Sequence, residues 1–203
     1  MLTDIAEQAG AQTLPEIVAV VTAILYLVFA IRENIVCWLF AAVSSLIYVW
    51  LFVVAKLYME SALYAFYALI AAYGWYSWHT GCHEGQDKPV VVWSRAIHGS
   101  AIPGIAVLSA LSGYLLETYT DAAYPYVDST TTWSAIWATY LVARKVLENW
   151  WYWLLIDIVS VIVYWLRDLQ LTSILFVVYV IMIPIGLISW KKSMYKQSHT
   201  ATV

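Results

Sequence analysis

The stretch Glu33-Asn34-Ile35-Val36-Cys37-Trp38-Leu39 returns in part 115 residues later as Glu148-Asn149-Trp150-Trp151-Tyr152-Trp153-Leu154. Asparagine occurs nowhere else in the chain. Without gaps, the same offset matches ten residues between Glu33 and Trp75, three of which are tryptophans. After Asn34 these are Trp38, Leu39, Ser45, Trp50, Leu51, Tyr64, Ile70 and Trp75. This pattern predicts an internal duplication. Duplicated membrane units are typical of transporters that bind substrate between their repeats.

The composition is that of an integral membrane protein. Hydrophobic residues make up 63% of the chain, charged residues 11%, and the mean hydropathy is +0.74. A soluble domain has roughly twice this charged fraction. Because lipid offers the backbone no hydrogen-bond partners, each span must be helical. Seven apolar stretches are the predicted spans: Leu14–Ile31, Ile35–Ala55, Ser61–Trp78, Ala96–Leu116, Thr131–Val146, Trp150–Leu166 and Leu171–Trp190.

The basic residues predict how the chain is oriented. With the N-terminus outside, the inner segments hold most of the lysines and arginines, and the outer segments hold only Lys56 and Arg167. The inner residues are Arg32, Lys88, Arg95, Arg144, Lys145, Lys191, Lys192 and Lys196. This is the positive-inside pattern. We therefore expect a multi-pass protein of the bacterial inner membrane with its C-terminus in the cytoplasm.

The offset also predicts the architecture. Four spans separate equivalent positions, so both repeats point the same way across the membrane. We expect an all-α fold with two parallel three-helix repeats joined by a linker helix. The predicted units are a first repeat at 1–79, a linker with the fourth span at 80–130, and a second repeat with a basic cytoplasmic tail at 131–203.

The sequence gives little support for a catalytic or cofactor-binding function. The chain has no GxxxxGK[ST] loop and no serine, histidine and aspartate pattern for an activated nucleophile. We expect no enzyme activity, no cofactor and no nucleic-acid partner. One inner loop collects His79, Cys82, His83 and Glu84. Their spacing fits no standard zinc site, so a flexible polar loop is favoured over a metal site.

The sixth span carries the strongest candidate site. Its polar and aromatic residues share one helical face: Trp150, Trp153, Asp157, Ser160 and Tyr164. Asp157 is the only acid well inside a span, where a carboxylate costs about 2.5–3.5 kcal/mol. One interpretation is a structural bond to a neighbouring helix. The other is an acceptor for a cationic or amine-bearing substrate, with tryptophan faces providing stacking and cation–π contacts.

Further aromatic residues are candidates for the same site. We expect contributions from Tyr64 and Tyr67 in the third span, Trp133 and Trp137 in the fifth, and Trp38 as the repeat mate of Trp153. Trp78, Trp93 and Trp190 stand at span ends and are predicted to lie in the interfacial belt.

The two asparagines have two interpretations. Asn34 and Asn149 begin spans, where asparagine is a favoured helix N-cap. Because Asn149 directly precedes Trp150, it is also a candidate substrate contact.

Two segments resemble the PnuC family of bacterial vitamin transporters. Glu148-Asn149-Trp150-Trp151-Tyr152-Trp153 after Arg144-Lys145 is similar to the ENWxxW segment of that family, and Leu57-Tyr58 with Tyr73-Gly74-Trp75-Tyr76-Ser77-Trp78 is similar to its LY…YGWYxW segment. The resemblance implies a 3+1+3 fold and facilitated diffusion of nicotinamide riboside, thiamine or riboflavin. It also implies an intracellular kinase that traps the imported vitamin.

Departures from the family pattern bear on the substrate. Nicotinamide riboside members place amide side chains where this chain has Tyr64, Ala71, Asp157 and Ile185. An acid at Asp157 fits thiamine, with its aminopyrimidine and thiazolium, so thiamine is preferred over nicotinamide riboside. A membrane substrate-binding subunit that needs a separate ATPase, a lipid-modifying enzyme and homo-oligomeric assembly remain open.

Overall fold

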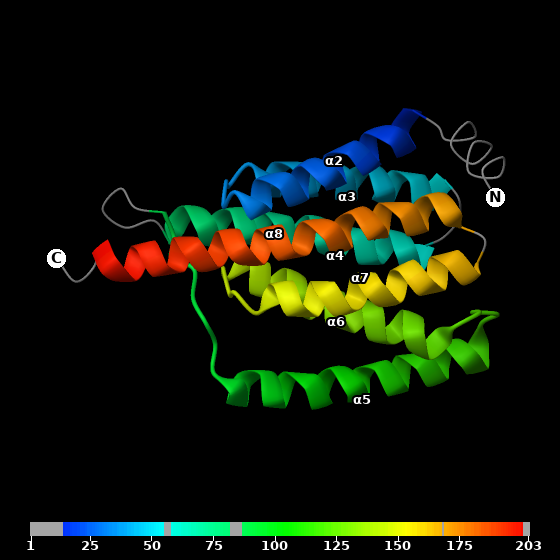
Figure 1. The fold of residues 1–203 in the computed structure, drawn as a ribbon. Helices are drawn as coiled ribbons and strands as arrows, with labels where there is room; N and C mark the ends of the chain where they lie inside the picture. Colours follow the sequence, from blue (N-terminus) through cyan, green and yellow to red (C-terminus); the bar gives the residue numbers. More distant parts are fainter. Residues whose placement is uncertain (1–13, 55–57, 82–86, 168, 201–203) are drawn as a thin grey trace.

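The computed structural model describes residues 14–54, 58–81, 87–167 and 169–200. Within these ranges the chain forms seven α-helices (Figure 1). They are α2 (Leu14–Ile31), α3 (Cys37–Val54), α4 (Tyr58–Thr80), α5 (Arg95–Tyr119), α6 (Pro125–Ala143), α7 (Asn149–Leu166) and α8 (Gln170–Thr200). The predicted all-α fold with seven helices is confirmed.

Two helix ends differ from the predicted spans by six residues or more. α6 begins at Pro125 rather than Thr131, because proline is favoured at the first helical position, where its missing N–H costs nothing. α8 continues past Trp190 to Thr200, so the basic tail prolongs the helix. By length and apolar composition, α2, α3, α5, α7 and most of α8 qualify as membrane spans. α4 and α6 are less apolar, and they pack against each other.

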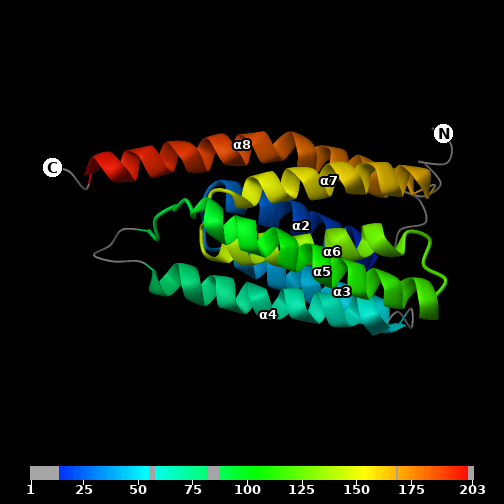
Figure 2. The same ribbon diagram turned by 90° about the horizontal axis from the view of Figure 1, so that it is seen from below.

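The helices form two groups of three with one helix outside them. α3 packs against both α2 and α4, and α7 packs against both α6 and α8. The groups join where α4 meets α6 and α2 meets α8, while α5 packs on α6 along the edge of the described bundle (Figures 1 and 2). This is the predicted 3+1+3 arrangement. α2 starts and α8 ends at opposite ends of the bundle (Figure 1).

The structure corrects the register of the repeat from 115 to 112 residues. Trp38 meets Trp78 edge-on with ring centroids 5.6 Å apart, and Trp150 meets Trp190 in the same way at 5.4 Å. Glu33 and Lys145 are also equivalent, with φ angles of 56° and 55°. The equivalent of Trp38 is therefore Trp150, not Trp153. The offset of 115 rests on the two Glu-Asn pairs, which do not occupy equivalent positions.

Reciprocal contacts show that an approximate two-fold axis relates the repeats. The Trp78 indole Nε1 donates to the Val142 carbonyl at 3.1 Å. Trp190 is the equivalent of Trp78, and Ala30 is the equivalent of Val142. The Trp190 Nε1 donates to the Ala30 carbonyl at 2.9 Å. Such exchanged contacts are the signature of two-fold symmetry. The axis runs between parallel repeats, as expected for this class of membrane fold.

Residues that touch their own equivalents must lie on this axis. Glu33 Oε2 and Lys145 Nζ form an ion pair at 2.9 Å, and the Trp78 and Trp190 rings lie 6.1 Å apart. These four residues are called the axial clamp below. Trp78 and Trp190 are 3% and 0% exposed. Their predicted place in the interfacial belt is therefore wrong, because their indoles fasten the two repeats together.

Two glycines make room for the indole rings of Trp38 and Trp150. A Cβ atom on Gly74 would collide with the Trp38 ring, and one on Gly186 would collide with the Trp150 ring. Gly74 and Gly186 are equivalent in the two repeats, as are Trp38 and Trp150. Each indole therefore lies directly against the backbone of the third helix of its own repeat, and any side chain at either glycine would push the helices apart.

Candidate functional site

A cavity of about 140 Å³ lies where α7 and α6 meet the first repeat. Five helices contribute to its lining, which is aromatic and apolar with a few hydroxyl groups. The lining residues are Ala23, Tyr26, Trp38, Ala41, Ser44, Ser45, Tyr67, Ile70, Thr139 and Trp153. It is called the central cavity below.

Aromatic faces and a few polar atoms define the chemistry of the central cavity. The Tyr26 and Trp38 rings lie 6.0 Å apart, and the buried indole Nε1 of Trp38 has no hydrogen-bond partner in the described structure. Ser44 Oγ donates to the Ala19 carbonyl at 3.0 Å, which leaves its oxygen as an acceptor. Buried donors without a partner are rare in proteins. The Trp38 N–H is therefore a candidate ligand contact.

The central cavity is smaller than a usual ligand site. Sites for drug-sized ligands usually measure about 300–1,000 Å³. The present cavity of about 140 Å³ has room for one ring but not for a complete vitamin. A substrate of that size needs the helices around the cavity to separate.

Three of the predicted site residues, Trp38, Tyr67 and Trp153, line the central cavity. Asp157 lies one turn further along α7, on the same face as Trp153. Its side chain is buried at 3% exposure. No ion pair or hydrogen bond to its carboxylate occurs within the described residues. A buried acid in a membrane helix usually faces a partner or a substrate path.

Two predicted residues at the start of α7 lie away from the cavity. Trp150 packs against Gly186 and Trp190. Asn149 is fully buried, and its Nδ2 donates to the Val146 carbonyl at 2.7 Å. Its side chain therefore does not cap the helix, and that expectation is wrong for Asn149. Asn34 Oδ1 accepts from the Val36 backbone N–H at 2.9 Å, but α3 begins only at Cys37, so this bond lies in the turn before the helix.

The remaining predicted aromatics belong to other clusters. Tyr64 packs against Tyr48 and Phe52 at 4.7 and 5.3 Å. The Trp133 indole donates to the Ser112 hydroxyl of α5 at 3.1 Å. Trp137 packs between Trp93 and Tyr140. None of these side chains lines the central cavity. The predicted loop residues Cys82, His83 and Glu84 lie outside the described residues.

Several residues of the cavity were not predicted. Tyr26, Ser44, Ser45 and Thr139 line it but carry no distinctive sequence motif. The corrected register supplies a signal for one of them, because Ser45 is the equivalent of Asp157. Equivalent positions of the two repeats thus place a hydroxyl and a carboxylate at similar depth.

A family described as "Nicotinamide mononucleotide transporter" matches residues 13–192. The chain belongs to this family. The resemblance to the PnuC proteins is thereby confirmed. Its relatives include the nicotinamide riboside transporter PnuC of Escherichia coli, 22% identical over 188 residues, which cover 80% of this chain and 79% of that protein. Another is the riboflavin/roseoflavin transporter RibM of Streptomyces davaonensis, 29% identical over 126 residues. That match covers 60% of this chain and 58% of RibM.

The fold of this family member agrees with a solved structure. The crystal structure of the vitamin B3 transporter PnuC aligns with a TM-score of 0.71 and 20% identity, over 96% of this chain and 90% of that one. Both PnuC and RibM are transporters, so the expectation that the chain is not an enzyme is confirmed at the level of the family.

Proposed function

We propose that this protein carries a cationic heteroaromatic vitamin across the bacterial inner membrane by facilitated diffusion, with thiamine as the first candidate. The observation that supports this most is the central cavity, where the aromatic side chains of Trp38, Tyr67 and Trp153 line a space of about 140 Å³. Asp157, whose carboxylate has no hydrogen bond or ion pair among the described residues, follows one turn beyond Trp153. Aromatic faces and a nearby carboxylate together favour a flat positively charged ring.

Thiamine fits this arrangement through its thiazolium charge and the amino group of its pyrimidine. The Asp157 carboxylate can accept a charge-assisted hydrogen bond from such a donor. Among the described residues that line the cavity there is no asparagine or glutamine, so the amide partners that a carboxamide would use are missing. Polar groups left unpaired on burial cost about 1–3 kcal/mol each.

Nicotinamide riboside is the second candidate. Its pyridinium ring is also flat and cationic, and the hydroxyls of Ser44, Ser45 and Thr139 offer alternative partners for its carboxamide. The PnuC relative of Escherichia coli is named for this substrate. Riboflavin, named for RibM, is neutral and larger, so Asp157 gives it no electrostatic advantage.

The proposed mechanism is a rocking motion of the two repeats about their common axis. The axial clamp holds one end of the bundle closed, and its release on that side would open the central cavity. The two moving units are α2–α4 and α6–α8, and α5 is the linker helix between them. An intracellular kinase would then trap the imported vitamin by phosphorylation.

The orientation proposed from the charges places the clamp at the cytoplasmic end. Lys145 belongs to the clamp, and Arg32 and Arg144 directly precede Glu33 and Lys145 in the chain. Cysteines introduced near Thr120, in the α5–α6 connection, should react with an impermeant thiol reagent from outside intact cells. Cysteines at Lys192 should react only after the membrane is permeabilised. The reverse pattern would contradict this orientation.

Uptake by the purified protein in liposomes tests the proposed function. Labelled thiamine should enter down its own gradient, saturably, without ATP and without an imposed ion gradient. Unlabelled nicotinamide riboside should compete less well than unlabelled thiamine, and riboflavin least. A requirement for a separate ATPase would instead support a substrate-binding subunit, and a strict need for a sodium or proton gradient would exclude facilitated diffusion.

A further inference from the structure

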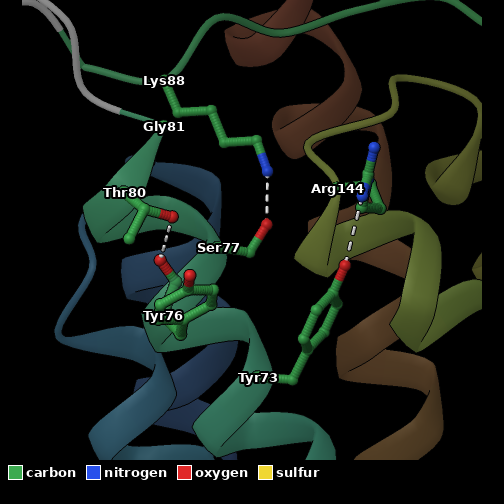
Figure 3. Close-up of a pocket in the computed structure, with 7 residues that line it drawn as sticks. All are labelled: Tyr73, Tyr76, Ser77, Thr80, Gly81, Lys88 and Arg144. Atoms are coloured by element: carbon green, nitrogen blue, oxygen red, sulfur yellow. Dashed lines mark hydrogen bonds between the residues drawn. The ribbon is translucent and has the colours of Figure 1, made fainter.

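A second pocket, of about 250 Å³, lies near the end of α6, where Arg144 precedes Lys145 of the axial clamp. Figure 3 shows the residues that line it. This pocket is called the basic pocket below. α4 supplies most of its lining, and the segment after α4 and the end of α6 complete it. Its residues are Tyr73, Tyr76, Ser77, Thr80, Gly81, Lys88 and Arg144.

Two cations in the basic pocket are held by neutral groups. Lys88 Nζ donates to Ser77 Oγ and to the Ala143 carbonyl, the latter at 3.2 Å. Arg144 donates from Nη1 to the Tyr73 hydroxyl at 3.3 Å. Neither side chain has a carboxylate partner in the described ranges. The nearby Lys145 is paired with Glu33, so the Glu33 carboxylate does not balance the charges of Lys88 and Arg144.

We propose that the basic pocket binds the phosphate group of a phosphate monoester. The guanidinium of Arg144 offers paired N–H donors suited to phosphate oxygens, and Lys88 adds a second positive charge. The Ser77 hydroxyl accepts from Lys88 and keeps its own proton to donate, whereas the Thr80 hydroxyl on the same wall donates to the Tyr76 carbonyl at 2.8 Å (Figure 3). The pocket is larger than a bare phosphate needs, and the side chains of Tyr73 and Tyr76 offer ring faces for the organic part of the ester.

The position of the basic pocket suggests what such a ligand would do. Lys88 bonds both to Ser77 in the first repeat and to Ala143 in the second. Arg144, at the end of α6, reaches across to Tyr73 of α4. An anion held by Lys88 and Arg144 therefore ties the two repeats together beside the axial clamp. If the protein transports a vitamin as proposed above, binding of the phosphorylated vitamin at this site would slow further uptake. The proposal that the basic pocket binds a phosphate monoester does not depend on this regulatory role.

The test is the thermal stability of the purified, monodisperse protein titrated with phosphate compounds at constant ionic strength. The soluble probes are inorganic phosphate and thiamine monophosphate, with potassium chloride as the blank. Nanodiscs with and without phosphatidic acid provide the lipid arm. Saturable stabilisation by thiamine monophosphate at lower concentrations than by inorganic phosphate supports the site and assigns it to a soluble monoester. Stabilisation by phosphatidic acid alone supports the same phosphate chemistry and assigns it to a lipid headgroup.

Matched variants locate the binding. Lys88→Met and Arg144→Gln should each weaken the apparent affinity for thiamine monophosphate at least about tenfold, because each removes a charge-assisted contact. Lys192→Met, an exposed lysine of the same end, should leave it unchanged. Lys88→Arg keeps the charge and should retain most of the affinity. Absence of saturable binding in the wild type, or equal affinities in Lys88→Met and Lys192→Met, would overturn the proposal. Because no transport is measured, this result is independent of the uptake experiment.

Discussion

Glu33 and Lys145 occupy equivalent positions in the two repeats and form an ion pair with each other. Both follow the C-terminal turn of a helix with φ near +55°, a conformation that is unusual for residues other than glycine. Their side chains are 12% and 1% exposed. Duplication alone would place identical residues on the axis. Opposite charges at this point make the contact between the repeats attractive.

Exchanging these two charges should preserve the fold. Lys145→Glu alone places two acids side by side and should destabilise the protein by about 3–5 kcal/mol, as expected for a broken buried pair. Glu33→Lys with Lys145→Glu restores an ion pair at the same point. Recovery should be incomplete, because Lys145 Nζ also lies 4.6 Å from the Trp78 ring, which a carboxylate cannot replace. Thermal unfolding of the three variants in detergent measures this. A double variant no more stable than Lys145→Glu would contradict the symmetric pairing.

Alanine in place of Gly74 or Gly186 should destabilise the protein. Gly74→Ala and Gly186→Ala each place a methyl group into an indole ring, and such overpacking typically costs about 1–3 kcal/mol. Gly99 and Gly104 in α5 are matched controls, because a Cβ there meets nothing within 4 Å. Alanine at these two positions should be neutral or stabilise the helix by up to about 1 kcal/mol. Equal melting temperatures for all four variants would show that Trp38 and Trp150 do not pack as described.

The charge on Lys88 should make anion binding depend on pH. Burial, and then repulsion from Arg144 and Lys145, lowers the pKa of Lys88 from 10.5 to about 8. The side chain is therefore charged below about pH 8 and loses its charge as the pH rises through that value. The other charged or titratable groups around it are Tyr73, Tyr76, Arg144 and Lys145.

Affinity for sulfate, whose own charge is constant over this range, should therefore fall between pH 7 and pH 9. Lys88→Arg should abolish the dependence, since the guanidinium stays protonated. Titrations of both proteins with sulfate at several pH values provide the measurement. An identical pH profile in the wild type and in Lys88→Arg would show that another group controls binding.

The sequence was sufficient to predict the seven helices, the parallel duplication and the family, because apolar length and the tryptophan motifs are local properties. The sequence predicted the wrong register between the two repeats. Three tryptophans crowd Trp150–Trp153, so Trp38 can be aligned with more than one of them. The chance coincidence of the two Glu-Asn pairs then favoured an offset that is three residues too long. Contacts across the axis, which have no counterpart in the sequence, decide between the alternatives.

The candidate site was harder to predict, for a related reason. Helical periodicity shows that Trp150, Trp153 and Asp157 share a face, but not which part of that face meets a cavity. In the structure Trp150 fills the space beside Gly186, and Trp153 reaches the cavity. Ser44 and Ser45 were overlooked because serine is common in membrane helices. Only the packing of α3 against α2 and α4 shows that they face inward.

Loss of the Asp157 charge should weaken binding of a cationic vitamin selectively. Asp157→Asn keeps the size of the side chain but removes its charge, so affinity for thiamine should fall about ten- to a hundredfold, which corresponds to about 1.5–3 kcal/mol. Binding of neutral riboflavin, if detectable, should change little. Asp157→Glu serves as the charge-preserving control. Isothermal titration calorimetry on folded protein gives the affinities. Unchanged thiamine affinity in Asp157→Asn would make this aspartate structural.

The most direct test of the central cavity is calorimetric titration of thiamine into wild type, Trp153→Ala and Trp151→Ala. Both tryptophans belong to α7, but Trp153 lines the cavity and Trp151 is 56% exposed on the outer surface. Removing one stacking face should cost about 1–3 kcal/mol, so Trp153→Ala should bind thiamine at least about fivefold more weakly. Trp151→Ala should match the wild type. Equal affinities in Trp153→Ala and wild type, or tighter binding of nicotinamide riboside than of thiamine by the wild type, would contradict the proposal that the central cavity selects thiamine.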